Sequence, residues 1–534
     1  MLEIPEAVIA IPIACLFALA ALPPSWSNNH VLLVRRSVTM ILAIQTVAAL
    51  MVLVKSYFFG PVAIKSSAVS LSGAAPIDPA IIELSAYLDG VSCLMFLMVS
   101  LVGFVVSRFS IRYLDGEATQ GRYFRWLGFT IAAVSTMTIS GNLLMFFAAW
   151  VMTSFGLHQL LLHYRHRAAA HRAAWTKFTI SRIGDAFLVA ALIVTFQSFG
   201  TFDIVTLFER AAEIADGGRV TVNQMAIGWL IVFGAMTKSA QFPFHTWLPN
   251  TMETPTPVSA LMHAGIVNAG GYLVVRTGSL VTLAPTALAV LAAIGAFTAC
   301  FGAIVMITQP SIKRALAYST IAQMGFMMLQ CGLGAFAAAM LHIVAHSFYK
   351  AYAFLNSGSV IAESRSLDGT AQHVAQSTER RWAVPVAFAL SAISLACVLA
   401  ILGIDITAKV GGLTFALIIC LALTTWGWRL LQSPQRNLWW VATFGIPMLC
   451  LLYGTSYAGI SMIVAGAIPT ESATAWTTIL VVDVALAFCL LFMLHAALRN
   501  DRSPIWLESL RIHAANEFYI DVIYRRVFGS LAKS

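Results

Sequence analysis

Long apolar runs separated by short polar segments form the main pattern of this chain. An α-helix needs about 20 residues to cross the hydrocarbon core of a bilayer. Apolar runs near that length occupy roughly residues 4–22, 38–58, 86–107, 125–140, 141–163, 179–199, 222–243, 256–276, 279–308, 315–335, 338–361, 384–404, 408–428, 438–464 and 475–498. They lack the alternation that is typical of strands. The pattern predicts an all-α polytopic membrane protein with about fifteen transmembrane helices.

The basic residues predict how these helices are oriented, because Lys and Arg concentrate in cytoplasmic loops. They fall at every second connection, as Arg35 and Arg36; Arg108, Arg112, Arg122 and Arg125; the stretch HYRHRAAAHRAAWTK; Lys313 and Arg314; Arg380 and Arg381; Arg429 and Arg436; Arg499 and Arg502. We expect a bacterial inner-membrane protein with its N-terminus outside and its C-terminus cytoplasmic. The loops 59–85 and 200–221 then lie on the outer side. No positive segment precedes the first run, so we expect it to stay as a helix rather than be cleaved as a signal peptide.

Composition supports lipid as the solvent of this chain. Hydrophobic residues make up 59% of it and charged residues 10%, whereas soluble domains average about 25% charged residues. The net charge of +9 is divided among the connections rather than gathered on one face, so we expect no nucleic acid partner. The 8 cysteines lie singly, and no metal-ligand, nucleotide or flavin motif is present. We expect no metal, no cofactor and no covalent catalysis by this chain.

Lys238 is a charged residue inside the apolar run at 222–243. A charge at bilayer depth costs about 2.5 to 3.5 kcal/mol on insertion scales, so it indicates a functional site. Pro243, and Pro249 if the helix resumes, each remove a helical hydrogen bond and free a carbonyl that can hold water or a cation. A broken helix with a buried lysine indicates a proton or cation relay. The alternative is that Lys238 extends to the membrane interface near the end of its run.

His342, His346 and Lys350 recur at every fourth residue and therefore share one face of a helix. Imidazoles titrate near physiological pH, and a row of them beside a lysine can pass a proton stepwise along the helix. The alternative is a structural role, in which the same side chains hydrogen-bond to neighbouring helices.

Three further polar residues lie in apolar runs. His263 stands about two turns into the run that follows the broken helix, which favours a relay role over a packing role. Arg182 and Asp185 are three residues apart near the cytoplasmic start of the sixth run. They form either an intramembrane ion pair that biases a neighbouring lysine or an anchoring pair at the interface.

Several motifs resemble the proton-conducting antiporter family, which includes the large membrane subunits of respiratory complex I and of multisubunit sodium/proton antiporters. The motifs are TKSAQFPFHTWLPNTMETPTPVSALMHAGIVNAGGYLVVR, QPSIKRALAYSTIAQMGFMML, HIVAHSFYKAYAFLNSGSVI, LDGVSCLMFLMVSLVGFVVSRFS and NEFYIDVIY. The resemblance implies two inverted five-helix repeats, each with a broken helix, and a hydrated line of lysines and histidines near mid-membrane. It makes Lys238 the central lysine, His263 its neighbouring histidine, and His342, His346 and Lys350 the following row.

Two departures from this family concern its lysines. The family places Glu after Trp in the fifth span as the partner of the central lysine, but here Val151 follows Trp150. Gating by a Lys–Glu pair is therefore in question, and it stays open whether Asp185 compensates. For the lysine of the second broken helix, the nearest candidate is Lys409, which could equally be a loop residue.

The absent Glu, the short C-terminus and the basic stretch LLLHYRHRAAAHRAAWTKF resemble the DabB family, the membrane subunits of two-component inorganic carbon transporters. The resemblance implies a hetero-complex with a DabA-like partner, whose zinc site resembles that of β-carbonic anhydrases. Protons or sodium ions flowing through this chain would energise CO2 conversion there, with protons the expected ion. Two alternatives stay open: a subunit of a complex I relative or sodium/proton antiporter, and a non-conducting scaffold, which explains the buried charges poorly.

Runs and resemblance together divide the chain into four segments. Residues 1–84 form N-terminal transmembrane helices and an outer loop, and residues 85–365 form the antiporter-like conducting core. Residues 366–499 form C-terminal transmembrane helices. Residues 500–534 form a charged amphipathic tail, which we expect on the cytoplasmic membrane surface or packed on a partner.

Overall fold

The computed structural model describes residues 6–65, 84–358, 380, 382–407, 409, 411–469, 475–498 and 504–528. Its longer helices are α1 (Ala10–Ala21), α3 (Val31–Phe59), α4 (Gly90–Tyr113), α5 (Gln120–Ile139), α6 (Leu143–Leu161), α7 (Ala168–Phe199), α8 (Ile204–Gly217), α9 (Val222–Lys238), α11 (Thr256–Ala264), α12 (Ala269–Arg276), α14 (Pro285–Thr308), α15 (Ile312–Gly332), α16 (Phe336–Leu355), α18 (Ala383–Ile401), α19 (Gly412–Gln432), α20 (Arg436–Val464), α21 (Ala475–Ala497) and α22 (Ile505–Ala515). Shorter elements are η1 (Glu6–Ile9), α2 (Pro24–Asn29), β1 (Val62–Lys65), β2 (Ser85–Leu88), η2 (Phe244–Thr246), α10 (Trp247–Asn250), η3 (Thr251–Glu253), η4 (Ile266–Asn268), α13 (Gly278–Val281), η5 (Glu517–Tyr519) and α23 (Ile520–Phe528).

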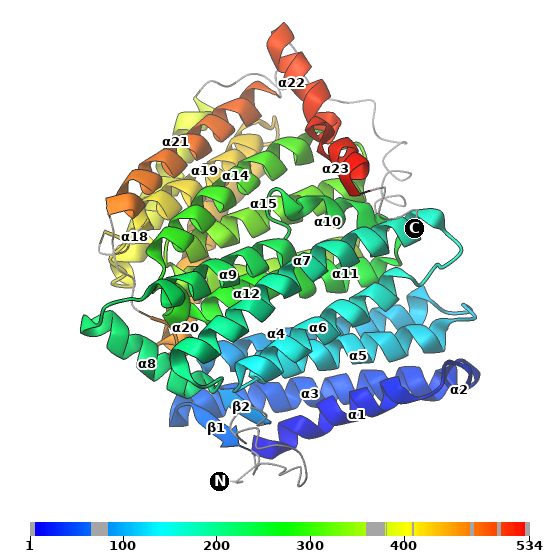
Figure 1. Ribbon diagram of the computed structural model, residues 1–534. Helices are drawn as coiled ribbons and strands as arrows, with labels where there is room; N and C mark the ends of the chain where they lie inside the picture. The colour runs from blue at the N-terminus through cyan, green and yellow to red at the C-terminus, as the bar shows by residue number, and fades with distance from the viewer. Residues whose placement is uncertain are drawn as a thin grey trace.

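The long helices lie side by side with roughly parallel axes, from α1 and α3 at one edge of the bundle to α18, α19 and α21 at the other (Figure 1). Each predicted apolar run overlaps one or more of these helices, which confirms the all-α membrane architecture. Within the described residues, ten helices are long and apolar enough to cross a membrane: α3, α4, α6, α7, Thr256–Arg276, α14, α18, α19, α20 and Thr478–Ala497. The total of fifteen and the inverted repeats stay predictions.

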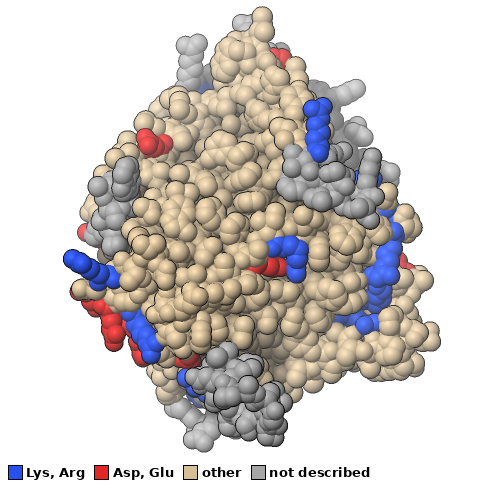
Figure 2. All heavy atoms as spheres, in the orientation of Figure 1, with Lys and Arg blue, Asp and Glu red and all other residues tan. Residues whose placement is uncertain are grey.

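The surface of the bundle is suited to lipid along its middle. Figure 2 shows uncharged atoms across most of this face, with most of the charged side chains towards the two ends of the helices. The central stretch Thr256–Arg276 has 94% of its most apolar window buried, whereas Thr478–Ala497 has 6%. The first therefore forms the interior of the bundle. The second exposes a strongly apolar surface, as a lipid-facing helix does.

One end of the bundle carries a short two-stranded sheet and two isolated β-bridges. β1 pairs antiparallel with β2, with Val62 opposite Leu88, and isolated bridges join Ala86 to Ser140 and Asn142 to Asp203. This end, with α8, lies opposite α2 and the C-terminal helices α22 and α23 (Figure 1). The predicted outer-loop residues 66–83 and the basic residues Arg381, Arg499 and Arg502 lie outside the described residues.

Close backbone packing fixes α15, which carries contacts to the candidate site. A Cβ atom added at Gly325 would lie 2.4 Å from the Ala299 nitrogen, and one at Gly332 would lie 2.4 Å from the Ala292 nitrogen. Only glycine allows α14 and α15 to approach this closely. In lipid, where apolar side chains gain nothing by leaving the solvent, such contact between small residues is a main source of helix association.

The sixth predicted run is wrong at its start. It was expected from residue 179, but α7 begins at Ala168, so the last two thirds of the stretch HYRHRAAAHRAAWTK are helical rather than loop. Arg182 and Asp185 therefore lie about 21 and 26 Å along the helix axis from its start. This position is near the middle of α7 rather than at an end.

Candidate functional site

Lys238 is the last residue of α9, and the regular helix ends there. Pro243 lies in the turn segment that follows, while Pro249 lies inside the four-residue α10. The Trp247 indole nitrogen donates to the Thr237 carbonyl over 3.3 Å, which gives a partner to a carbonyl near the helix end. Lys238 is only 4% exposed. Its side chain therefore lies inside the bundle and does not extend to the surface.

Ser154 of α6 holds two buried lysines. The Lys238 ammonium donates to the Ser154 hydroxyl oxygen over 2.9 Å, and the Lys177 ammonium of α7 donates to the Ser154 carbonyl over 2.8 Å. Both lysines are almost fully buried. The Lys238 nitrogen also lies 4.4 Å from the centre of the Trp150 ring. A cation over an aromatic face gains about 0.5 to 2 kcal/mol. Among the described residues, no carboxylate forms a salt bridge with Lys238.

Asp185 of α7 accepts a hydrogen bond from the same Trp150 side chain. The Trp150 indole nitrogen donates to Asp185 Oδ1 over 3.0 Å, and Arg182 Nη2 lies 2.6 Å from Asp185 Oδ2. The Trp150 side chain thus lies between the Asp185 carboxylate and Lys238. The charges of Asp185 and Arg182 both act on that lysine. The sequence-predicted residues Arg182, Asp185 and Lys238 therefore form one cluster, in which an acid near the lysine comes from α7.

Lys177 is a site residue that the sequence analysis missed, because it closes a basic stretch that was assigned to a loop. A weaker signal was present. Ala170, Ala173, Ala174 and Lys177 follow the spacing of one helix face, and all four are buried. The small alanines let α7 approach its neighbours, and the lysine continues the same face into the bundle.

His263 begins a second cluster, at the end of α11 and just before the helix is interrupted by η4. It is fully buried, its Nδ1 lies 2.9 Å from the Thr320 hydroxyl of α15, and its ring stacks on Phe354 with centroids 4.4 Å apart. These contacts fix the ring orientation. They leave its second nitrogen free to interact within the cluster.

The row on α16 is present as the spacing predicted. His342 Nδ1 lies 3.0 Å from Gln330 Oε1, the His342 and His346 ring centroids are 5.9 Å apart, and the Lys350 ammonium donates to the Leu316 carbonyl over 3.0 Å. His346 and Lys350 are buried, whereas His342 is partly exposed. The row thus runs from the more accessible His342 to the enclosed Lys350.

Two hydrogen bonds link the clusters through their helix breaks. The Ser239 hydroxyl, next to Lys238, donates to the Val267 carbonyl over 2.6 Å. The Asn268 amide, next to Val267, donates to the Ser347 hydroxyl over 2.9 Å. Ser347 follows His346 directly in the chain. Backbone and side-chain polar groups therefore connect the surroundings of Lys238 with those of the α16 row.

Three histidines keep an unsatisfied ring nitrogen. Within the described residues, Nε2 of His263, His342 and His346 has no hydrogen-bond partner. Buried polar atoms normally have a protein or water partner, so these nitrogens are places where ordered water can bind. Water between neutral imidazoles is a route by which a proton can pass.

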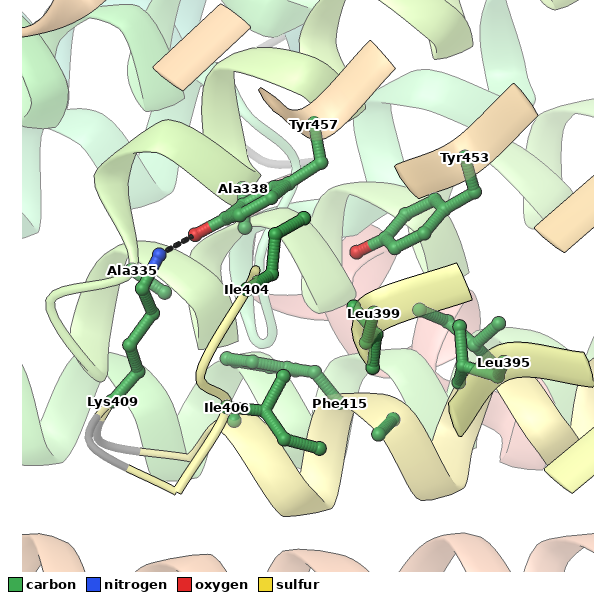
Figure 3. A pocket seen from close by; sticks show the side chains of 13 residues that line it. Ala335, Ala338, Leu395, Leu399, Ile404, Ile406, Lys409, Phe415, Tyr453 and Tyr457 are labelled. Atoms are coloured by element: carbon green, nitrogen blue, oxygen red, sulfur yellow. Dashed lines mark hydrogen bonds between the residues drawn. The ribbon is translucent and has the colours of Figure 1, made fainter. Parts of the chain in front are cut away.

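Lys409 lies in the connection between α18 and α19 rather than within a helix. Its ammonium donates to the Tyr457 hydroxyl over 2.6 Å. Figure 3 shows this bond beside a cavity of about 50 Å³, with Tyr453 and Tyr457 extending from α20 and apolar side chains such as Phe415 around them. A volume above about 15 Å³ holds a water molecule. No hydrogen bond among the described residues joins this lysine directly to the α16 row.

The site offers groups that can bind and release protons. Among the described residues, no group of three or more His, Cys, Asp or Glu could hold a metal ion. The lysines and histidines instead contact hydroxyl, backbone carbonyl and side-chain amide oxygens. These neutral partners stabilise an ammonium without fixing it as a permanent ion pair, so its protonation can change.

Two protein-family models match the part of the chain that carries the candidate site. One described as "NADH:quinone oxidoreductase/Mrp antiporter, TM" matches residues 140–432, and one described as "NADH-Ubiquinone oxidoreductase (complex I), chain 5 N-terminus" matches residues 76–124. Among solved structures, the Mrp complex from Dietzia sp. DQ12-45-1b has a TM-score of 0.65 at 20% identity and covers 98% of this chain and 60% of that chain. That likeness supports the fold alone.

Curated relatives carry inorganic carbon transporter names. The probable inorganic carbon transporter subunit DabB of Hydrogenovibrio crunogenus is 34% identical over 82% of this chain and 82% of its own length. The probable subunit DabB2 of Halothiobacillus neapolitanus is 44% identical over 54% of this chain, and the match spans about half, 52%, of that relative. These matches confirm the resemblance that the motifs indicated.

Proposed function

This chain belongs to the NADH:quinone oxidoreductase/Mrp antiporter family of membrane subunits and is similar to DabB inorganic carbon transporter subunits, and from this premise we propose that it carries protons for an energy-coupled inorganic carbon transporter. The proton flow energises CO2 conversion to bicarbonate in a zinc-containing, carbonic anhydrase-like partner. This chain itself supplies the conducting path and performs no covalent chemistry.

One observation carries the proposal. Lys177, Lys238 and Lys350 are buried side chains that donate to hydroxyl or carbonyl oxygens, and no salt bridge joins them to a carboxylate among the described residues. A buried charge is costly unless it is compensated. Groups that only hold structure are more cheaply made apolar, so the retention of these ammoniums favours a role in which they change protonation.

The proposed setting is a bacterial inner membrane with the N-terminus outside. The basic connections then face the cytoplasm, as does the tail that includes α22 and α23. The Tyr524 hydroxyl of this tail donates to the Pro243 carbonyl in the α9 break over 2.6 Å. The cytoplasmic surface beside the broken helix is therefore where we propose that the partner acts.

Proton flux tests the proposal directly. The full chain, with whatever proteins purify with it, is reconstituted in liposomes containing a pH-sensitive dye, and a potassium diffusion potential drives flux. Lys238→Ala should abolish the flux without loss of assembly, while Lys313→Ala, which changes a lysine in the first turn of α15, should leave it intact. Full flux in Lys238→Ala would contradict proton conduction. A signal that requires sodium in the buffer would identify sodium as the ion.

The second candidate is an antiporter-like subunit of a complex I relative or sodium/proton antiporter. The family match over residues 140–432 favours it equally, because that match covers the shared conducting core. The two functions differ in their partners. Purification from native membranes should yield one large zinc-containing protein under our proposal, whereas a set of several small hydrophobic subunits would support the antiporter.

A further inference from the structure

Two lysines from different helices converge on one serine. Lys177 of α7 binds the Ser154 carbonyl, and Lys238 of α9 binds the hydroxyl of the same residue, over 2.8 and 2.9 Å. Among the described residues, neither ammonium forms a salt bridge with an acid. Asp185, the acid whose charge acts on both, is already engaged by Arg182 and Trp150.

Helix packing holds the two lysines in place. A Cβ added at Gly184 would lie 2.1 Å from the Thr237 hydroxyl oxygen, and one at Gly234 would lie 2.7 Å from Leu188 Cδ2. These glycines bring α7 and α9 into close contact on one side, so both lysine stems reach α6 from fixed positions. The geometry is therefore built by the fold and does not depend on flexible loops.

Electrostatics disfavours two charges in this space. Like charges in a poorly solvated site repel strongly, and nothing bound directly to either nitrogen compensates them. The arrangement favours a single proton shared by the two amines. Ser154 is suited to join them, because a hydroxyl carries one proton to donate and two lone pairs that accept.

We propose that Lys177 and Lys238 form a proton-exchange pair joined by Ser154, and that this pair takes the place of the carboxylate absent at Val151. This rests on the proposed function and deepens it. The Lys177 ammonium turns from the Ser154 carbonyl to the hydroxyl of the same residue and gives it a proton. The hydroxyl releases its own proton to the neutral Lys238 amine. One N–H bond breaks and one forms, the serine is regenerated, and the charge moves from α7 to α9.

Ser154→Ala tests the step because it removes the hydroxyl and keeps the backbone carbonyl that holds Lys177. Proton flux should fall about tenfold, since one hydrogen bond in the path is lost, and the flux should become more sensitive to replacement of water by D2O. Ser154→Thr, which restores the hydroxyl, should recover flux. Melting temperatures of all variants show whether they fold; unchanged flux in a folded Ser154→Ala protein overturns the pair.

A double variant separates a shared step from two separate ones. If Lys177 acts through Ser154, Lys177→Met and the double variant Lys177→Met/Ser154→Ala should have the same flux. Losses that multiply would overturn the exchange pair. Lys238→Ala distinguishes the two levels: full flux there defeats the proposed function, whereas abolished flux there with full flux in Ser154→Ala defeats only the exchange pair.

Discussion

The bundle holds buried charge in two different ways. Arg276, the last residue of α12, donates to Asp89 Oδ2 over 2.7 Å, and these side chains are 1% and 3% exposed. Asp89 also caps α4 by accepting from the Ser92 backbone nitrogen over 2.8 Å. Lys177 and Lys238, which are buried to a similar degree, instead donate to neutral oxygens of Ser154.

The difference separates a structural charge from an exchangeable one. In the Arg276–Asp89 pair, each charge compensates the other. Neutralising either side chain therefore leaves the other charge unpaired in a dry interior. Within the part of the chain that the structure describes, no carboxylate forms a salt bridge with either lysine, so loss of the proton removes a buried charge and leaves no partner unpaired. We therefore expect changes at the first pair to affect stability and changes at the second to affect flux.

The largest effect is expected at the compensated pair. Asp89→Ala leaves Arg276 without its carboxylate and should lower the free energy of unfolding by about 3 to 5 kcal/mol, with about 1 kcal/mol more from the lost helix cap. Thermal unfolding of the detergent-purified chain measures this. Asp89→Asn keeps a capping oxygen and removes only the charge, so it should account for most of the loss. A melting temperature equal to wild type in both variants would break the comparison.

The next effect is on flux and concerns Asp185. Asp185→Asn keeps an oxygen for the Trp150 indole but removes the negative charge near Lys238, so proton flux should fall by roughly a hundredfold, as for loss of a positioned proton-transfer group. Its stability cost should stay below about 1 kcal/mol, because the side chain of its partner Arg182 is 40% exposed. Liposome flux and melting temperature are compared on one preparation. A large loss of stability with normal flux would make Asp185 a structural acid like Asp89.

A smaller effect separates the two histidines of α16. His346→Gln keeps a hydrogen-bonding side chain that cannot titrate, and flux should fall by about tenfold or more. His342→Gln should lose less, because His342 is the less enclosed of the two side chains. The same flux assay measures both variants. Equal losses, or a larger loss at His342, would show that the enclosed end of the row is not the limiting part.

The sequence predicted single helices better than contacts between them. The α16 row follows from spacing alone, because one helix face is a local property, and the apolar run at 279–308 ends at Thr308 as α14 does. Lys177 was hidden by its basic neighbours, since its burial depends on how α7 packs on α6 and α9. The Trp150–Asp185 bond likewise joins two helices. Such contacts require tertiary geometry, which a single sequence without alignment does not supply.

The smallest expected effect concerns His163, a buried titratable group outside the membrane helices. It adds a third case to the comparison between the Arg276–Asp89 pair and the lysine pair. His163, between α6 and α7, has its Nε2 2.8 Å from Glu117 Oε2. Burial lowers the pKa of His163, although the hydrogen bond and charge of Glu117 oppose this. The folded protein therefore favours the neutral ring more than the unfolded chain does.

The sign of the pH dependence follows from that shift. Stability from neutral His163 is complete above its ordinary pKa of about 6.5 and is lost as the pH falls from there through the lower folded pKa. The melting temperature of wild type minus that of His163→Gln should be constant above about pH 7 and decline as the pH falls below about 6.5. Proton flux at pH 7.5 should be the same in both. A difference that grows in favour of wild type towards acid would mean that the Glu117 contact outweighs burial, and that this histidine, unlike the lysine pair, is stabilised by being charged.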